Sequence, residues 1–254
     1  MHKDSFQPLF IGKDQVILPS CHSTNEVAAD LLSAGKATDG MVVITDRQTK
    51  GRGQRGNSWE SEPFKNLTFS IILTPKFLPV YCQFELTKVT SLALVDTLTE
   101  QGLKKVTIKW PNDVYCGPSK IAGILIENSV RTTSLESTIV GIGLNVNQRA
   151  FQIDNATSLV LETGKEHDPP ALLTKLLRHF QNRYLRLQQG ADKALGQQYE
   201  HHLLWRGEKH LFENMITKTV FTGTIMGTDQ QGKLHIVTEN QEFYFDFKEV
   251  VFLE

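Results

Sequence analysis

Hydrophobic and polar positions divide the first part of the chain into a helix and two strands. In residues 23–35, a polar Ser23-x-x-Glu26 start is followed by apolar residues at helical spacing, which predicts a capped helix that stops at a glycine. Residues 41–45 and 67–73 are β-rich runs on either side of a polar, glycine-rich segment. The pattern therefore predicts a loop between two strands.

The next segments alternate between helix and strand. Residues 86–101 predict a helix that is apolar on most sides and therefore buried. Three extended segments follow, at residues 106–110, 120–127 and 138–146. A second helix begins at Pro169-Pro170, and its apolar stripe should cover the sheet. This mixture predicts an α/β or α+β sandwich.

After Trp205 the pattern changes to short β-rich runs separated by polar turns. The runs are residues 220–226, 233–238, 242–247 and 250–253. They predict a small β-barrel over residues 206–254 beside a larger domain over residues 1–205. Because about 45 residues bury too little apolar surface to be stable alone, the barrel should dock on the larger domain.

Composition narrows the functional class. The 254 residues are 40% hydrophobic and 22% charged, as in ordinary soluble globular proteins. The 27 Lys and Arg balance 28 Asp and Glu, so no global positive field favours nucleic acid or an anionic membrane. The N-terminus lacks a secretory signal, and the apolar runs are far shorter than the roughly 20 residues that span a bilayer. We therefore expect a cytoplasmic protein.

Cysteine and histidine give no metal or disulfide signal. Cys21, Cys82 and Cys116 are an odd count without paired spacing, which predicts reduced, structural thiols. The eight histidines show no H-x-x-x-H or H-x-H pattern. We expect no resident metal ion.

The loop at residues 47–56 concentrates positive charge. It holds four cations and three glycines without an acidic residue, in a chain whose net charge is -1. Glycines let the backbone bend and expose N–H groups, so the loop is suited to holding phosphates. Two alternatives stay open, a solvated basic turn and an RGG-like nucleic-acid segment. The second is disfavoured because one copy lies between two strands.

Strand alternation places Gly141, Gly143, Asn145 and Asn147 on one face of the third extended segment. The two glycines leave room for a flat ligand against the backbone, and the two amides could hydrogen-bond it. The alternative is a pair of glycines beneath a crossing helix, followed by surface asparagines.

Two further groups of polar residues, and the tryptophans, each have two interpretations. Lys120 begins a strand whose remainder is apolar, and it could lie beside Asp113 as an anion-binding pair or as a structural ion pair. Ser23-Thr24-Asn25 could cap a helix or bind a small polar ligand at its N-terminus. The tryptophans are predicted to be core residues rather than stacking platforms. They are Trp59, Trp110 and Trp205.

Taken together and in this order, four segments resemble the biotin protein ligases. They are Ser23-Thr24-Asn25, the loop Gly51-Arg-Gly-x-Arg-Gly56, Lys109-Trp-Pro-Asn-Asp113 with Lys120-x-x-Gly-Ile-Leu-Ile-Glu127, and Gly141-Ile-Gly-Leu-Asn145. The resemblance covers residues 20–150 closely. It implies an α+β fold with a mixed-sheet catalytic domain and a small C-terminal SH3-like barrel.

The resemblance also implies the reaction. Biotin and ATP would form biotinyl-5′-adenylate with Mg²⁺ as the activating ion, and the biotinyl group would then pass to one lysine of a biotin carboxyl carrier protein. Arg52, Lys120 and Asp113 would be catalytic, with Asp113 assisting removal of a proton from the carrier lysine. The biotin site would comprise Ser23, Thr24, Asn25, Gln48, Arg52, Gly53, Gln54, Lys120, Gly123 and Gly143. The ATP site would comprise Arg52, Arg55, Asn112, Asp113, Lys120 and Asn145.

The chain departs from the family pattern at two loop positions. The family's loop commonly reads G-R-G-R-x-G-R, whereas Gln54 and Asn57 stand at its second and last arginine positions. Two positive charges are therefore missing, although Lys50 could compensate. We hypothesise weaker retention of the adenylate.

Competing interpretations remain. A lipoate or octanoate ligase or transferase would share the fold, but its R-R-x-x-G-G-G type of loop is absent. A non-catalytic biotin-binding regulator is disfavoured because Arg52, Asp113 and Lys120 occur together. Residues 1–19 read as a short tail and strand, and the 22 residues before Ser23 are too few for a helix-turn-helix, so DNA binding is not expected. A homodimer through a sheet edge is compatible with the family.

Overall fold

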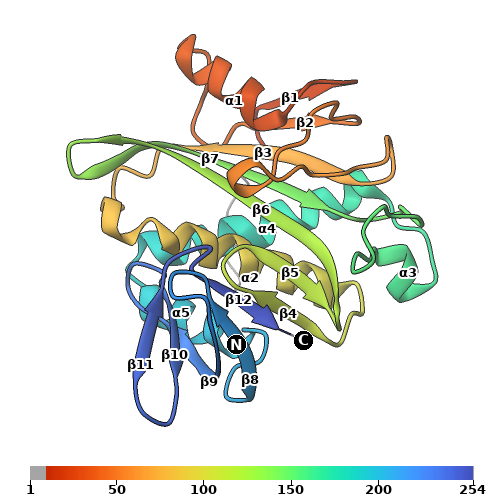
Figure 1. Cartoon of the computed structure of the whole chain (residues 1–254). Helices are drawn as coiled ribbons and strands as arrows, with labels where there is room; N and C mark the ends of the chain where they lie inside the picture. Colours follow the sequence, from red (N-terminus) through yellow and green to blue (C-terminus); the bar gives the residue numbers. More distant parts are fainter. Residues whose placement is uncertain (1–9, 254) are drawn as a thin grey trace, which may run out of the picture.

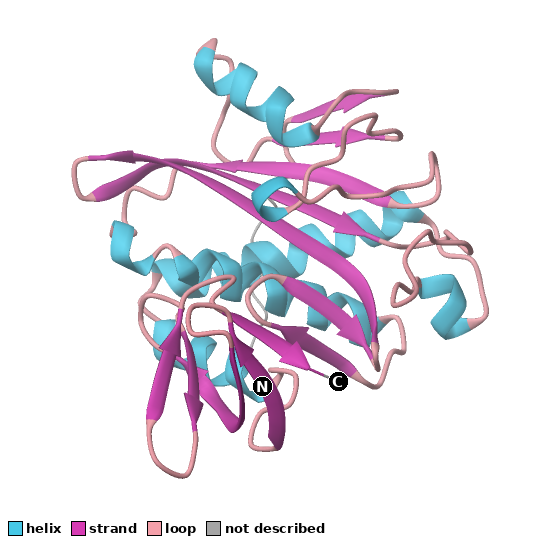
Figure 2. Cartoon of the chain, viewed as in Figure 1, coloured by secondary structure: helices cyan, strands magenta, loops and turns pink. Residues whose placement is uncertain are grey.

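A seven-stranded mixed sheet forms the centre of the computed structural model, which describes residues 10–253. Its strands are β1 (Gln15–Leu18), β2 (Val42–Thr45), β3 (Leu67–Leu73), β4 (Val106–Lys109), β5 (Asp113–Cys116), β6 (Ser119–Arg131) and β7 (Ser134–Leu144). They lie in the order β1-β2-β3-β7-β6-β5-β4, with β1 and β2 parallel and the other neighbours antiparallel. The long strands β3, β6 and β7 cross the molecule (Figures 1 and 2).

Helices cover both faces of this sheet (Figure 1). α2 (Phe84–Glu100) and α4 (Pro169–Gln188) pack together on one face, and α1 (Thr24–Ser33) packs on β2, β3 and β7. The remaining helices are α3 (Leu159–Thr163), α5 (Asp192–His201) and the short 3-10 helices η1 (Gln54–Gly56) and η2 (Val80–Cys82).

The alternation of β3 separates the two layers. All seven residues of β3 are buried. Phe69 and Ile71 lie in the large core with α2 and α4, whereas Ile72 packs beneath α1 with Ala28 and Val43. The bounds of β3 are those that the β-rich run at residues 67–73 predicted.

A second, antiparallel sheet follows α5. Its strands are β8 (Lys209–Asn214), β9 (Thr219–Thr228), β10 (Leu234–Val237), β11 (Glu242–Phe245) and β12 (Val250–Leu253), in the order β11-β10-β9-β8-β12. Trp110 Nε1 donates a hydrogen bond of 2.8 Å to the carbonyl of Gly232, and Phe84 packs on the same glycine. We propose the domain boundary between residues 205 and 206, because the chain passes from α5 into the second sheet there.

The structure confirms the α+β class and corrects several local predictions. Ser23 is the residue before α1, but its side chain forms no capping hydrogen bond, so the predicted capping box is wrong. The strands β5 and β8 were not predicted, because β5 coincides with a Pro-Asn-Asp turn signal and β8 is polar and only half-buried. The predicted tail and strand at residues 1–19 falls partly outside the described residues; β1 lies in the described part.

Within residues 10–253, the structure has no helix with the length and apolar character needed to cross a membrane.

A substitution at Gly232 tests the docking of the second sheet on the larger domain. Its φ is +90°, and an added Cβ would overlap the Phe84 ring, so Gly232→Ala should lower the free energy of unfolding by about 2–4 kcal/mol. Gly207→Ala is the matched control, since Gly207 has φ +78° and open space around an added Cβ. Urea denaturation should show a smaller loss for Gly207→Ala; equal losses would contradict the contact.

Candidate active site

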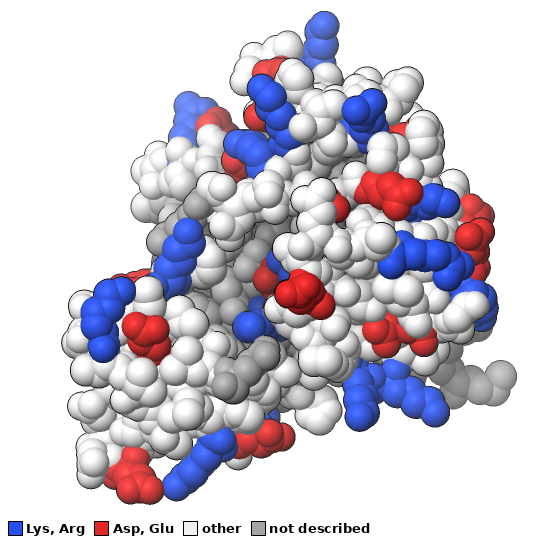
Figure 3. All heavy atoms as spheres, turned by 45° about the vertical axis from the view of Figure 1, so that its right-hand side comes forward, with Lys and Arg blue, Asp and Glu red and all other residues white. Residues whose placement is uncertain are grey.

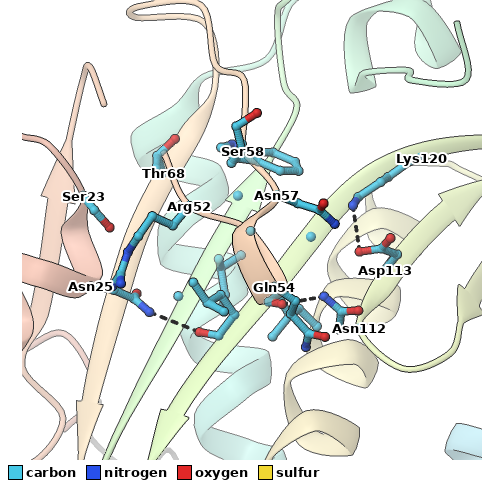
Figure 4. Close-up of a pocket in the computed structure, with 18 of the residues that line it drawn as sticks. Ser23, Asn25, Arg52, Gln54, Asn57, Ser58, Thr68, Asn112, Asp113 and Lys120 are labelled. Carbon is cyan, nitrogen blue, oxygen red and sulfur yellow. Dashed lines mark hydrogen bonds and ion pairs between the residues drawn. The ribbon is translucent and has the colours of Figure 1, made fainter. Parts of the chain in front are cut away.

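Most of the predicted site residues line one cavity of about 230 Å³, called the slot below (Figure 4). These residues are Ser23, Thr24, Asn25, Gln48, Arg52, Gly53, Gln54, Asn112, Asp113, Lys120, Gly123 and Gly143. Ligand pockets usually measure about 300–1,000 Å³, so the slot is small. On the space-filling surface, positive and negative side chains are intermingled around a hollow (Figure 3).

Strand register explains why distant residues meet in the slot. Thr68 of β3 pairs with Gly143, Gly143 with Gly123, Gly123 with Asp113, and Asp113 with Lys109. Directly paired residues of antiparallel strands point to the same face of the sheet, so this row crosses five strands on one face. All five residues line the slot.

Two predicted residues differ. Asn145 is not among the described residues that line the slot: β7 ends at Leu144, and Asn145 is buried, with Nδ2 donating to the Thr157 carbonyl at 2.9 Å. The strand therefore ends one residue before Asn145, and the alternation that was expected to place this side chain in the slot does not continue that far. The backbone of Arg55 lies in η1, and its side chain is outside the described part.

The glycines of β7 carry planar groups of the protein itself. The Asn25 amide lies on Gly141 and the Trp59 ring lies on Gly143, where an added Cβ would overlap each of them. Gly123 contacts the same ring, with an added Cβ 3.0 Å from Trp59 Cζ3. Trp59 therefore lines the slot, and its prediction as a core residue is wrong.

Hydrogen bonds fix the polar groups at the α1 end of the slot. Gln48 Oε1 accepts from the backbone N–H of Thr24 at 2.8 Å, which satisfies a helix N-terminal donor in place of the expected Ser23 cap. Ser70 Oγ lies 2.7 Å from Thr24 Oγ1 and donates to Asn25 Oδ1 at 2.6 Å. The Ser23 hydroxyl points toward the slot (Figure 4).

The opposite end carries an ion pair. Lys120 Nζ lies 2.7 Å from Asp113 Oδ1, as the sequence led us to expect, and about a quarter of each side chain is exposed. A register shift between Val114 and Tyr115 sets Lys120 opposite Tyr115 on the neighbouring strand. Asn112 Nδ2 donates to the Ile124 carbonyl at 2.7 Å, which fixes the turn before β5.

The loop between β2 and β3 folds over the slot. The backbone bonds from Trp59 N to Gly51 O, 3.0 Å, and from Gly53 N to Asn57 O, 2.7 Å, hold its hairpin shape. Arg52 NH2 lies 3.0 Å from Glu127 Oε2, and Arg52 Nε lies 3.7 Å from Glu26 Oε1. The slot thus has a cation at each end, and each cation contacts a carboxylate.

Besides Trp59, sequence reasoning missed several residues at or near the slot. Ser70 and Thr68 belong to a run that reads as buried strand, and only pairing with Gly141 and Gly143 places them here. Phe247 comes from the turn between β11 and β12, which no local pattern could connect to the slot. Glu127 ends a recognised motif, and a charged residue directly after the apolar run Ile124-Leu-Ile126 was an available signal.

The fold and the slot together define a class of protein. A mixed sheet bearing a glycine-floored slot, with a cation at each end and a loop above, is suited to a ligase that activates a small carboxylic acid. Comparison with known proteins gives the family. The model of the biotin/lipoate A/B protein ligase family matches residues 17–145, and the chain belongs to this family.

Individual relatives agree with this assignment. The bifunctional ligase/repressor BirA of Bacillus spizizenii is 30% identical over 225 residues, which is 85% of this chain and 67% of that protein. The biotin–[acetyl-CoA-carboxylase] ligase of Mycobacterium tuberculosis is 29% identical, over 83% of this chain and 79% of that protein. The structure of biotin protein ligase from Aquifex aeolicus in complex with biotin and ATP has a TM-score of 0.79 and 31% identity, covering 94% of this chain and 98% of that chain.

The contact between Trp59 and Gly143 is testable by fluorescence. Gly143→Ala should push the Trp59 ring off β7 and into solvent, which shifts tryptophan emission to longer wavelength and lowers the free energy of unfolding by about 1–3 kcal/mol. In a Trp59→Phe background the same substitution should leave emission from Trp110 and Trp205 unchanged. An unshifted spectrum for Gly143→Ala would show that the ring lies elsewhere.

Proposed function

We propose that this protein is a biotin protein ligase. It uses ATP to convert biotin to biotinyl-5′-AMP, releasing pyrophosphate, and then transfers the biotinyl group to a lysine of a biotin carboxyl carrier protein. The observation that carries the proposal is the slot, whose ends hold Arg52 and Lys120. Its similarity at 31% identity to a ligase bound to biotin and ATP supports the substrates.

The α1 end is the proposed site of the biotin head. Ser23 and Thr24 lie at the N-terminus of α1, whose dipole and N–H groups favour a polar ligand. Gln48 and Ser70 hold Thr24 in place before the ligand arrives, so less side-chain entropy is lost on binding. Asn25 donates to Glu127 and accepts from Ser70, and it therefore forms a fixed wall.

The first step brings two anions together, because the carboxylate of biotin must attack the α-phosphate of ATP. Lys120 and Arg52 would neutralise charge as it builds at this phosphate. Lys120 must first leave Asp113, and Arg52 must leave Glu127, before either cation can bind the incoming anion. The partner exchange keeps both cations compensated before and after binding.

Magnesium would fit the end of the slot that holds Asp113 and Lys120. Mg²⁺ commonly binds one or two carboxylates together with substrate phosphates, and Asp113 is freed when Lys120 turns to phosphate. No group of three or more His, Cys, Asp or Glu that could hold a metal occurs within residues 10–253. The ion would supply further charge neutralisation at the phosphates.

The second step is attack by the carrier lysine on the acyl carbon of the adenylate, with AMP leaving. The amine of the carrier lysine has an ordinary pKa of about 10.4, so it must lose a proton before it attacks. Asp113 is the proposed acceptor because its carboxylate lies at the phosphate end of the slot. Trp59 and Phe247 would exclude water from the mixed anhydride.

The wider setting follows from this activity. A supply of ATP and a carrier protein supports a cytoplasmic location, and the net charge of -1 supports a protein that does not bind nucleic acid. Homodimerisation stays a prediction; β1 and β4 are the edge strands of the larger sheet. A lipoate or octanoate ligase remains the alternative that the test below must separate.

Exchange of labelled pyrophosphate into ATP tests the first step directly. Biotin should support exchange, whereas lipoate and octanoate should not, because the polar groups at the α1 end are placed for a polar ring. Lys120→Ala should lower biotin-dependent exchange by about 100-fold or more, since it removes a cation at the developing charge.

Lys105→Ala is the matched control for Lys120→Ala, because Lys105 is exposed and lies outside the slot. Exchange with octanoate but not biotin would overturn the substrate assignment. Near-normal exchange by Lys120→Ala would overturn the role of that lysine.

Gln54 tests the effect of the missing loop charges. Gln54 and Asn57 line the slot where the family pattern has arginine. Gln54→Arg should reduce the free biotinyl-adenylate that accumulates without carrier protein by about tenfold, as one charge-assisted hydrogen bond of about 1.5–3 kcal/mol would do. Chromatography of the released adenylate measures this, with Gln197→Arg at an exposed position of α5 as the control. Unchanged release would count against the hypothesis.

A further inference from the structure

A carboxylate outside the slot contacts the framework of its phosphate end. Lys120 and Asp113 face each other at this end (Figure 4), and the strand β5 runs from Asp113 to Cys116. Glu162 belongs to α3 and is not among the described residues that line the slot. Its Oε2 accepts a hydrogen bond of 3.4 Å from the Cys116 thiol. Glu162 is therefore attached to the strand that carries the partner of Lys120.

The backbone of Lys120 is bonded to a short segment, residues 155–157. The pairing between β6 and β7 does not include Lys120. Residues 155–157 lie beside it instead and run parallel to β6. The Lys120 N–H donates to the Asn155 carbonyl at 2.7 Å, and the Thr157 N–H donates to the Lys120 carbonyl at 2.8 Å. This segment therefore satisfies both backbone polar groups of Lys120.

Glu162 holds this segment through Thr157. The Thr157 side chain is buried, and its Oγ1 donates to Glu162 Oε1 at 2.6 Å. A hydroxyl bonded to a carboxylate usually lies at about 2.5–2.7 Å, and such bonds are among the stronger hydrogen bonds in proteins. The Thr157 carbonyl accepts from Asn145 Nδ2 at 2.9 Å. Thr157 is thus bonded through its side chain and through both of its backbone polar groups.

The two oxygens of Glu162 take different donors. Oε1 accepts from Thr157, and Oε2 accepts from Cys116. Burial, with a further contribution from the bonded Glu162 carboxylate, raises the pKa of the Cys116 thiol to about 12. The thiol is therefore protonated at neutral pH and can donate its hydrogen. One carboxylate thus joins β5 to the segment that is bonded to Lys120.

We propose that Glu162 is a positioning residue for Lys120. Through Thr157 and Cys116 it fixes the backbone of Lys120 relative to β5, and hence the point from which the lysine side chain reaches the phosphate. When a phosphate replaces Asp113 as the partner of the ammonium, the side chain turns while its backbone stays in place. The effect on catalysis rests on the proposed function, whereas the effect on the backbone does not.

A small displacement of Lys120 matters because its charge must meet the phosphate at a defined place. Misplacement of a catalytic group by about 1 Å can lower a rate by about 100-fold. The ammonium of lysine is carried on a flexible four-carbon stem, so it can follow a shifted backbone in part. We therefore expect a loss of about tenfold when the backbone is released.

Amide hydrogen exchange of the ligand-free protein tests the backbone contact. Glu162→Ala removes both acceptor oxygens, so the N–H groups of Lys120 and Thr157 should exchange about tenfold faster than in the wild type, as loss of one charge-assisted hydrogen bond predicts. The N–H of Ile72, which donates to the Met41 carbonyl in another part of the sheet, should exchange at an unchanged rate. Unchanged rates at Lys120 and Thr157 would overturn the proposal.

Substitutions at Thr157 separate this contact from a general effect on α3. Thr157→Val keeps the shape of the side chain but removes the hydroxyl, and it should reproduce the faster exchange at Lys120 although α3 is unaltered. Thr157→Ser keeps the hydroxyl and should retain most of the protection. Glu166→Ala is the matched control, because Glu166 is exposed and pairs with Arg149 at 3.9 Å. Fast exchange in Glu166→Ala, or slow exchange in Thr157→Val, would contradict the proposed route.

Kinetic measurements test whether Glu162 acts through Lys120. Glu162→Ala should lower kcat for biotin-dependent pyrophosphate exchange about tenfold, because Lys120 meets charge that develops in the reaction. The KM for biotin should change by less than about twofold, since the biotin head is placed at the α1 end. In a Lys120→Ala background the same substitution should lower exchange by less than about twofold, because the group that it positions is absent. Equal losses in the two backgrounds would show that Glu162 acts on something other than Lys120.

Failure of this proposal and failure of the proposed function give different results. If the wild type gives no biotin-dependent exchange of pyrophosphate, the proposed function fails, and amide exchange in the ligand-free protein still decides whether Glu162 fixes the Lys120 backbone. If the wild type gives exchange and Glu162→Ala matches its kcat, the positioning role fails and the proposed function stands.

Discussion

Close approach to the backbone of β7 is the constraint on which the slot depends. Gly141 and Gly143 have no side chain, so the Asn25 amide and the Trp59 ring can lie directly on the strand. The first contact fixes the α1 end, and the second brings the loop down onto the sheet. A Cβ at either glycine would raise these groups and separate the loop from Glu127 and Lys120. The glycines therefore set the height of the entire site above the sheet.

Charge compensation is the second condition. Two of the cations that line the ligand-free slot are paired with carboxylates, Lys120 with Asp113 and Arg52 with Glu127. An incoming carboxylate or phosphate then replaces a protein carboxylate as the partner of each cation. Because the pairs are partly exposed, each bond is weak enough to exchange. Neutral pairing also explains how a chain of net charge -1 can hold an anion site without a positive surface.

The sequence allowed the elements to be predicted where pattern and local chemistry agree, as in β3 and α4, and it placed Lys120 beside Asp113. Prediction failed where strand pairing decides which residues lie next to one another. Thr68, Ser70 and Glu127 reach the site only through pairing with β7, and pairing is not visible in local periodicity. Asn145 was misplaced because an alternation rule continues past the end of a strand at Leu144. Trp59 was misread because composition favours burial for tryptophan, whereas a loop position next to glycines favours a contact surface.

The segment that carries the second sheet supplies one wall of the slot. Phe247, from the turn between β11 and β12, lines it beside Trp110, whose indole N–H is bonded to Gly232. The docking of the two sheets thus fixes one wall of the cavity, while the loop above remains the part that can move. The loop is held by backbone hydrogen bonds, by the two partly exposed ion pairs of Arg52 and by the Trp59 ring on Gly143, which are weaker together than the packed core below. A site with a rigid floor and wall and one weakly held cover can admit a ligand without unfolding the sheet that orients it.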